Sequence, residues 1–147
     1  VAPEIAKAKA ALALKPKIYD ESADGARQLA EALALAKAQH KRVLLQFGAN
    51  YCGPCHALHE FLQADKNVAE ALNAHYVVVM VDVNQGHNAN LCVRYGPGGR
   101  PTIVVLGDDG KKLITENPGQ WAKGYWPSAR YSPEKALAFL NEWAPKQ

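Results

Sequence analysis

Apolar and polar residues follow two different periods along the chain, and the change of period separates expected helices from expected strands. In residues 26–40, apolar side chains recur at helical spacing, which predicts an amphipathic helix. The continuous apolar runs at residues 43–47 and 75–83 are short and rich in β-branched side chains, so each predicts a buried strand. A third run at residues 101–106 precedes the turn sequence at residues 108–110, which predicts a strand that continues into a hairpin.

Shorter patterns complete the expected order of elements. Residues 57–62 carry apolar side chains at helical spacing, and a last helix should run from residue 133 to about residue 144, with Ser132 as its N-cap. The remaining expectations, in chain order, are the candidate caps Asp20, Ser22 and Asp24 before the helix at 26–40, a short helix at 68–74 capped by Asn67, a helix at 88–95 ended by Gly96, and an irregular loop at 116–131.

This order of elements predicts an α/β domain with a central mixed sheet flanked by helices. The first two strands are joined through a helix and should be parallel, whereas the last two should form an antiparallel hairpin. The Ala-rich segment before Pro16 is expected to be a helical extension or a tail. We therefore expect two parts, an extension at residues 1–16 and one domain at residues 17–147.

Composition excludes several classes of protein. The 147 residues are 48% hydrophobic and 21% charged, which is an ordinary globular balance. The net charge is +3 and the lysines are scattered, so we expect no nucleic acid binding, and no apolar run is long enough for membrane insertion. Three cysteines are too few for a disulfide-stapled fold. Because the chain begins with Val-Ala-Pro rather than Met, we expect a removed leader or a trimmed sequence.

The pattern that carries chemistry is Cys52-Gly53-Pro54-Cys55, between a predicted strand and a predicted helix. A cysteine at a helix start meets unpaired N–H groups and the positive end of the helix dipole. A thiol there loses its proton more readily, and the thiolate is the nucleophile in disulfide exchange. Pro54 suits the first helical turn, and the spacing brings the second sulfur back beside the first. The motif therefore predicts a dithiol–disulfide exchanger.

Three segments resemble the thioredoxin superfamily: Phe47-Gly-Ala-Asn-Tyr-Cys-Gly-Pro-Cys, Tyr95-Gly-Pro-Gly-Gly-Arg-Pro-Thr-Ile-Val-Val-Leu and Asp109-Gly-Lys. The resemblance covers roughly residues 17–144 and is nearest to small bacterial proteins described as disulfide isomerases. It implies a thioredoxin fold and a protein thiol–disulfide oxidoreductase whose direction, reductase, oxidase or isomerase, stays open. It implies no cofactor besides the redox-active cysteine pair itself.

The resemblance also implies roles for single residues. Cys52 would be the solvent-facing attacking thiol and Cys55 the buried resolving thiol. Pro101 would be a cis proline beside the disulfide, leaving the backbone of Arg100 free to pair with an extended substrate, and Tyr51 would border the same groove. The implied partners are protein substrates and a redox protein that recycles a monomeric enzyme. We expect the bacterial periplasm or secretion, with the cytoplasm as the alternative.

One position departs from the thioredoxin pattern. Gln46 stands where thioredoxins carry a buried Asp that helps to deprotonate the resolving cysteine. Asp82, His56 or His59 could take over this proton transfer, although a surface-facing histidine is the simpler interpretation of the last two. Without such a base a second function is open, namely a redox-linked module that binds or chaperones polypeptides with little turnover.

The cysteine motif allows two other interpretations. With the histidine that follows it, the motif also matches the attachment signature of c-type haem, and Met80 could then be an axial ligand. Alternatively, Cys52, Cys55, His56 and His59 could bind zinc together.

Two further features have open interpretations. Cys92 is expected to be a buried small hydrophobe or, alternatively, a redox-sensing thiol. The loop at 116–131 could bind unfolded polypeptide beside Cys52 or cover the edge of the sheet. Its aromatic residues are Trp121, Tyr125, Trp126 and Tyr131.

Overall fold

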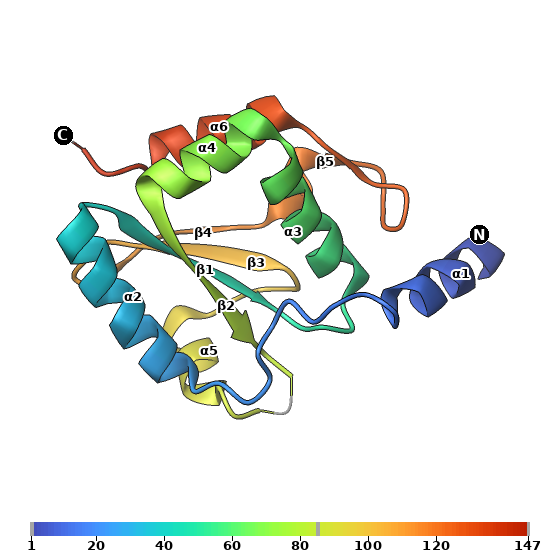
Figure 1. The fold of residues 1–147 in the computed structure, drawn as a ribbon, viewed down its shortest axis with the longest axis horizontal. Coiled ribbons are helices and arrows are strands. Elements are labelled where there is room, and N and C mark those ends of the chain that lie inside the picture. The colour runs from blue at the N-terminus through green and yellow to red at the C-terminus, as the bar shows by residue number, and fades with distance from the viewer. Residues whose placement is uncertain (1, 85, 147) are drawn as a thin grey trace.

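The computed structural model describes residues 2–84 and 86–146 and contains a four-stranded mixed sheet with helices on both faces (Figure 1). Its strands are β1 (Arg42–Gly48), β2 (Tyr76–Asp82), β3 (Thr102–Leu106) and β4 (Lys112–Glu116). Its helices are α1 (Ala2–Leu12), α2 (Gly25–Gln39), α3 (Gly53–Ala64), α4 (Lys66–His75), α5 (Ala89–Tyr95) and α6 (Pro133–Glu142). The predicted α/β class is confirmed. The predicted parts 1–16 and 17–147 include positions 1, 85 and 147, which lie outside the described residues.

The sheet is built around β1, in the strand order β2-β1-β3-β4. β1 runs parallel to β2 and antiparallel to β3, and β3 pairs antiparallel with β4. Gln46 of β1 lies opposite Met80 on one side and Ile103 on the other. The predicted parallel first pair and the predicted hairpin are both confirmed.

β2 is less buried than its apolar run predicts. It forms one edge of the sheet, where Val78 is 37% exposed and Met80 is half-buried. Within the described residues no strand pairs with its outer side, so part of the strand reaches solvent. A run of β-branched residues suits a pleated surface in a central or an edge position, which is why the prediction of a fully buried strand is wrong.

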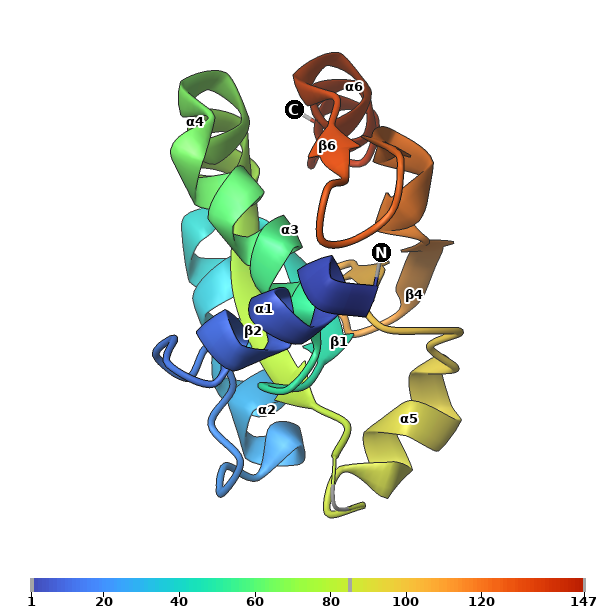
Figure 2. The same ribbon diagram turned by 90° about the vertical axis from the view of Figure 1, so that its right-hand side faces the viewer.

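Side chains of β1 alternate between two cores. Leu45 and Phe47 are fully buried against α2 and α5. Leu44 belongs to the opposite core, which α3, α4 and α6 enclose, and Figure 2 shows α4 and α6 together on the side away from α2 and α5. The same alternation places Gln46 and Gly48 on the face below α3. This is the face where the motif cysteines lie.

Side-chain caps fix the starts of two predicted helices. Of the candidates Asp20, Ser22 and Asp24, the last caps α2 and accepts a hydrogen bond from the backbone N–H of Ala26 at 3.0 Å. Ser132 caps α6 as predicted. Both helices therefore begin where the sequence places them.

α4 begins earlier than predicted, because Asp65 rather than Asn67 is its cap and accepts a hydrogen bond from the backbone N–H of Val68 at 3.0 Å. We expect Asp65→Ala to lower the free energy of unfolding by about 1 kcal/mol. Denaturant unfolding measures this change. Asn67→Ala is the matched control, because Asn67 is exposed, and an equal loss in both variants would contradict the assignment.

The segment at residues 116–131 is not the irregular loop that the sequence predicts. Trp121 is 3% exposed, its indole N–H donates to Glu116 at 3.2 Å, and its ring lies 5.5 Å from that of Phe139. These contacts stabilise a segment of short elements, none of which is long enough to show a periodic pattern in the sequence. The elements are the 3-10 helix η1 (Pro118–Trp121) and the paired strands β5 (Ala122–Lys123) and β6 (Arg130–Tyr131).

The N-terminal segment is helical over residues 2–12, so of the two expectations the helical extension is correct there. α1 extends beyond the sheet, and the chain after it meets α3 through an ion pair between Lys15 and Glu60 (Figure 1). In the two described stretches, no helix has both the length and the apolar character needed to cross a membrane.

Candidate active site

The two motif cysteines form a disulfide at the start of α3, with their Cα atoms 5.2 Å apart. Cys52 is the N-cap residue, and its sulfur accepts a hydrogen bond from the backbone N–H of Cys55 at 3.2 Å. Gly53 and Pro54 form the first turn, where proline's missing N–H donor leaves no helical hydrogen bond unmade. The Cys52 sulfur thus lies at the positive end of the helix, a position that stabilises a thiolate once the disulfide is opened.

Cys52 is more enclosed than the resemblance implies. Cys55 has no exposed surface, as expected for a resolving cysteine, but Cys52 is only 9% exposed and not solvent-facing. The indole ring of Trp126 lies against Gly53 so closely that a methyl group on this glycine would overlap it. The segment between β5 and β6 therefore folds over the motif, in agreement with the expectation that the loop at 116–131 lies beside Cys52.

A buried tyrosine lies beneath the disulfide. Tyr19 is 1% exposed and packs with Cys52 and Cys55. A methyl group on Gly48 would overlap both the Tyr19 hydroxyl and the Cys55 sulfur, so these two groups lie side by side. Gln46 is also 1% exposed, and its Nε2 donates a hydrogen bond to the Tyr19 hydroxyl at 3.4 Å. Burial raises the pKa of Tyr19 far above its ordinary value, so the phenol stays protonated.

Asn50 holds Tyr19 in this position. The Asn50 side-chain oxygen accepts hydrogen bonds from the backbone N–H groups of Ile18 at 2.9 Å and Tyr19 at 2.8 Å. The side-chain Nδ2 of Asn50 donates to the Tyr19 carbonyl oxygen at 2.8 Å. The backbone carbonyl oxygen of Asn50 lies 2.8 Å from Nε2 of His56. Asn50 thereby ties the segment before α2 and the first turn of α3 to the loop that leads into the motif.

Two of the three candidates for proton transfer are buried. Asp82 is 1% exposed, and its Oδ1 accepts a hydrogen bond from the backbone N–H of Asn84 at 3.1 Å. Its Oδ2 has no hydrogen-bond partner among the described residues, with Nε2 of His87 3.8 Å away. His56 is 4% exposed, because its ring is held by the Asn50 carbonyl, so the surface-facing interpretation of this histidine is wrong.

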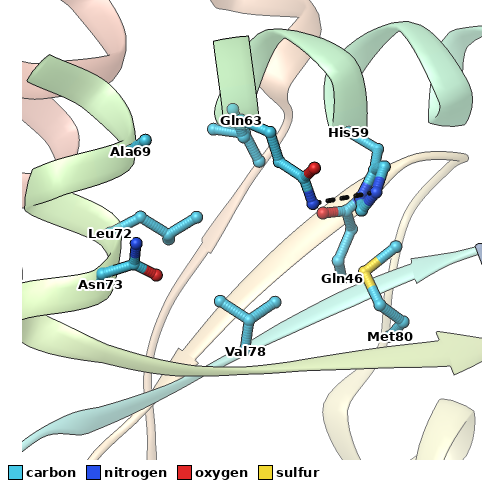
Figure 3. Close-up of a pocket in the computed structure, with 9 residues that line it drawn as sticks. Gln46, His59, Gln63, Ala69, Leu72, Asn73, Val78 and Met80 are labelled. Atoms are coloured by element: carbon cyan, nitrogen blue, oxygen red, sulfur yellow. Dashed lines mark hydrogen bonds between the residues drawn. The ribbon is translucent and has the colours of Figure 1, made fainter. Parts of the chain in front are cut away.

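His59 lies one turn further along α3 and borders a cavity of about 420 Å³ between α3, α4 and β2 (Figure 3). Its Nε2 is 3.0 Å from Nε2 of Gln63, and burial lowers the pKa of its imidazole. Figure 3 shows the Gln46 side chain turned toward His59 and Gln63. His59 therefore reaches the surroundings of Gln46, on the cavity side of the site.

Tyr51, Arg100 and Pro101, which the sequence predicts to bind substrate, come together beside the motif. The guanidinium carbon of Arg100 lies 5.3 Å from the centre of the Tyr51 ring, and its Nη1 donates to the Tyr51 hydroxyl. The Arg100–Pro101 peptide bond is cis. An adjoining cavity of about 200 Å³ has both of these residues in its lining, together with Pro54, Ala57, Tyr125, Trp126 and Tyr131.

The haem and zinc interpretations gain no support from this arrangement. The two sulfurs are bonded to each other, the ring of His56 is held by Asn50, and Met80 packs beside Tyr19. In the part of the chain that the structure describes, no three His, Cys, Asp or Glu side chains converge to hold a metal ion.

Cys92 is the free cysteine of the described residues. It is half-buried on α5, packs against the core between α2 and the sheet, and has its thiol pKa raised by burial. It is thus less enclosed than the buried hydrophobe that the sequence suggests.

Comparison with known proteins agrees with the fold and the motif. Residues 29–133 match the thioredoxin-like domain, and the chain belongs to this family of thiol–disulfide oxidoreductases, with Cys52 and Cys55 as its CXXC redox pair. The structure of a disulfide isomerase from Xylella fastidiosa Temecula1 is 31% identical, with a TM-score of 0.70 over 86% of this chain and 96% of that chain.

Two further relatives are similar over smaller shares of this chain. A thioredoxin structure from Thermus thermophilus is 28% identical, with a TM-score of 0.59 over 77% of this chain and 81% of that chain. A protein disulfide-isomerase from Zea mays is 31% identical over 120 residues, which is 73% of this chain. This chain spans 23% of the length of that maize protein.

The sequence analysis missed two residues of the site, namely Tyr19 and Asn50. A signal existed for the first, because Ile18 and Tyr19 form an isolated apolar pair in an otherwise polar connection. Asn50 acts through contacts with residues distant in sequence, and no local pattern marks such contacts. Trp126 belongs to the aromatic loop that the sequence offers as a neighbour of Cys52, and the structure places it there, against Gly53.

Proposed function

We propose that the protein exchanges disulfides with polypeptide substrates through a mixed disulfide at Cys52. The observation that carries this proposal is the Cys52 sulfur at the N-cap of α3, where it accepts the Cys55 N–H at 3.2 Å. Backbone donors and the helix dipole stabilise the thiolate that must attack. Cys55 has no exposed surface and lies on the same turn, so its role is to attack Cys52 rather than a substrate.

In the reductive direction the Cys52 thiolate attacks a substrate disulfide, forms one S–S bond to the substrate and releases the other substrate sulfur as a thiolate. Cys55 then loses its proton and attacks the Cys52 sulfur, so that the Cys52–Cys55 bond forms and the second substrate sulfur leaves. The substrate gains two electrons, and a separate redox protein must reduce the pair again. The reverse sequence oxidises a dithiol, and isomerisation uses Cys52 alone until another substrate thiol expels it.

The second candidate function is a binding or chaperone module with little turnover. Two observations favour it: Cys52 is only 9% exposed, and the neutral Gln46 stands where thioredoxins have a buried acid. Reduction of insulin by dithiothreitol separates the two functions. Exchange requires the protein to accelerate this reduction well above a Cys52→Ser variant, whereas equal rates would favour the binding module.

The polypeptide substrate, in this proposal, lies along Tyr51, Arg100 and Pro101 and places an apolar side chain in the adjoining cavity of about 200 Å³. The cavity supports this role because proline and aromatic side chains form much of its lining. Tyr125 is 91% exposed beside it and offers a further aromatic contact.

Trp126→Ala tests this substrate site. We expect the kcat/KM for an unfolded polypeptide disulfide to fall about tenfold, because buried aromatic anchors dominate binding. The rate with a small disulfide, oxidised glutathione, should not fall, because that substrate does not need the cavity and Cys52 becomes more accessible. An equal change for both substrates would contradict a binding role and leave Trp126 as a structural cover of Gly53.

Location, assembly and recycling complete the proposal. The neutral Gln46 supports an oxidant or isomerase that works in the periplasm or after secretion, rather than a reductase of the cytoplasm. Cell fractionation tests this location. We expect a monomer in solution, which light scattering measures. The recycling partner in this proposal is a thiol–disulfide protein, which would return electrons to the pair through a mixed disulfide.

A further inference from the structure

Tyr19 carries a buried hydroxyl group that takes no part in the exchange reaction described above. It lies in the segment between α1 and α2, yet its side chain reaches beneath α3 and packs with both motif cysteines. Two hydrogen bonds with Asn50 fix its backbone and a third holds the backbone N–H of Ile18, and Gly48 leaves the space that the Tyr19 hydroxyl and the Cys55 sulfur share. The Tyr19 hydroxyl and the Cys55 sulfur therefore border the same space above Gly48.

Among the described residues, the Tyr19 hydroxyl accepts a hydrogen bond but donates none. The oxygen accepts from Gln46 Nε2 at 3.4 Å, and a phenol has one proton to donate. Among the described residues, no acceptor receives that proton in the disulfide form. The adjoining Cys55 sulfur is a weak acceptor in a disulfide but a strong one as a thiolate.

The groups around Tyr19 keep it a neutral donor. Burial raises the pKa of its phenol, and the negative charge of Asp82 raises the pKa further. Gln46 is neutral and acts in the opposite direction through its hydrogen bond. The phenol therefore neither ionises nor takes up a proton while the cysteines react.

We infer that Tyr19 donates a hydrogen bond to the Cys55 thiolate and thereby speeds the second step of exchange. This inference rests on the proposed function, because it concerns the cysteine that resolves the mixed disulfide. In that step the Cys55 proton goes to solvent, and the Cys55 electron pair forms the bond to the Cys52 sulfur. The bond from Cys52 to the substrate breaks, and its electron pair leaves on the substrate sulfur. Tyr19 keeps its own proton throughout and only stabilises the charge on Cys55.

The test follows the two steps separately in the reduced protein with Ellman's reagent, in a Cys92→Ser background. Attack by Cys52 on the reagent's disulfide releases one thionitrobenzoate and leaves the other bound to Cys52 as a mixed disulfide. Attack by Cys55 then releases the second, so a stopped-flow absorbance trace contains both rates. We expect Tyr19→Phe to slow the second release by about tenfold and to leave the first unchanged, because hydrogen bonds to charged groups are the stronger ones.

Tyr95→Phe is the matched control. Tyr95 is 2% exposed and donates its hydroxyl to the Gly110 carbonyl oxygen at 3.1 Å, in the core on the other face of the sheet. Its loss should lower stability without changing the ratio of the two rates. The unfolding midpoint of both variants is measured in the same buffer, so a loss of stability is separated from a loss of the second step.

Each outcome of the experiment decides the question. A selective slowing of the second release in Tyr19→Phe supports the inference. An unchanged ratio of the two rates overturns it, and so does an equal change of that ratio in Tyr95→Phe. If the parent protein shows no first release, the proposed function itself fails, and this result is distinct from the failure of Tyr19 alone.

Discussion

Cys52→Ser should slow disulfide exchange by about a thousandfold or more, because it removes the sulfur that forms the mixed disulfide. A serine hydroxyl at the N-cap of α3 preserves the helix cap, so the fold should be retained. Cys55→Ser should instead block the second step of exchange. The first step remains, but nothing on the protein can release the substrate, and the mixed disulfide should accumulate.

Non-reducing gels and peptide mass spectrometry with an insulin substrate measure both outcomes. In Cys55→Ser the substrate should be attached to Cys52. Cys92→Ser is the control and should retain the activity of the parent protein, since Cys92 lies on α5 and packs against the other core. Attachment of substrate to Cys92, or full activity of Cys52→Ser, would contradict the assigned roles.

Gln46→Asp should lower the free energy of unfolding by about 4 kcal/mol at neutral pH, because a carboxylate would replace a neutral side chain in a buried site. Gln46 is 1% exposed, so the new charge would be largely desolvated. The nearby Asp82 lies on β2 two positions beyond Met80, the strand partner of Gln46, and would repel it. The substitution also removes the hydrogen-bond donor to Tyr19.

The stability that Gln46→Asp loses should increase as the pH rises. Burial raises the folded-state pKa of the new carboxyl above its unfolded value of about 4. Below that value both states are protonated and the charge costs nothing; the penalty grows as the pH rises toward the folded-state pKa and is complete above it. Gln46→Asn shortens the side chain equally without adding charge, so its cost should not vary over this range. Parallel pH profiles for the two variants would contradict the picture of Gln46 as a buried position.

The sequence predicts the core elements of this fold because their periodicity is local. β1, α2 and α6 each bury one continuous pattern of side chains, and their places follow from that pattern. The exposure of β2 depends instead on whether another strand lies beside it. The short strands β5 and β6 pair with each other over two residues each, which is below the length at which a period is visible.

The same contrast holds at the site. Cys52 and Cys55 are predictable because a turn of helix between them suffices to close the disulfide. The cover of Trp126 on Gly53 and the contact of Tyr19 with Cys55 join residues far apart in the chain. His56 illustrates the limit further, because its hydrogen bond with the Asn50 carbonyl turns an expected surface side chain into a buried one.

A redox titration of Cys52 and Cys55 tests the central claim most directly. The Cys92→Ser protein is equilibrated in glutathione buffers of stepped potential, and free thiols are then counted by alkylation and mass spectrometry. The two thiols should disappear together in one reversible two-electron transition, in which a tenfold change in the equilibrium constant corresponds to about 30 mV. Thiols that persist under oxidising conditions, or that form separate glutathione adducts instead of one internal disulfide, would contradict the account.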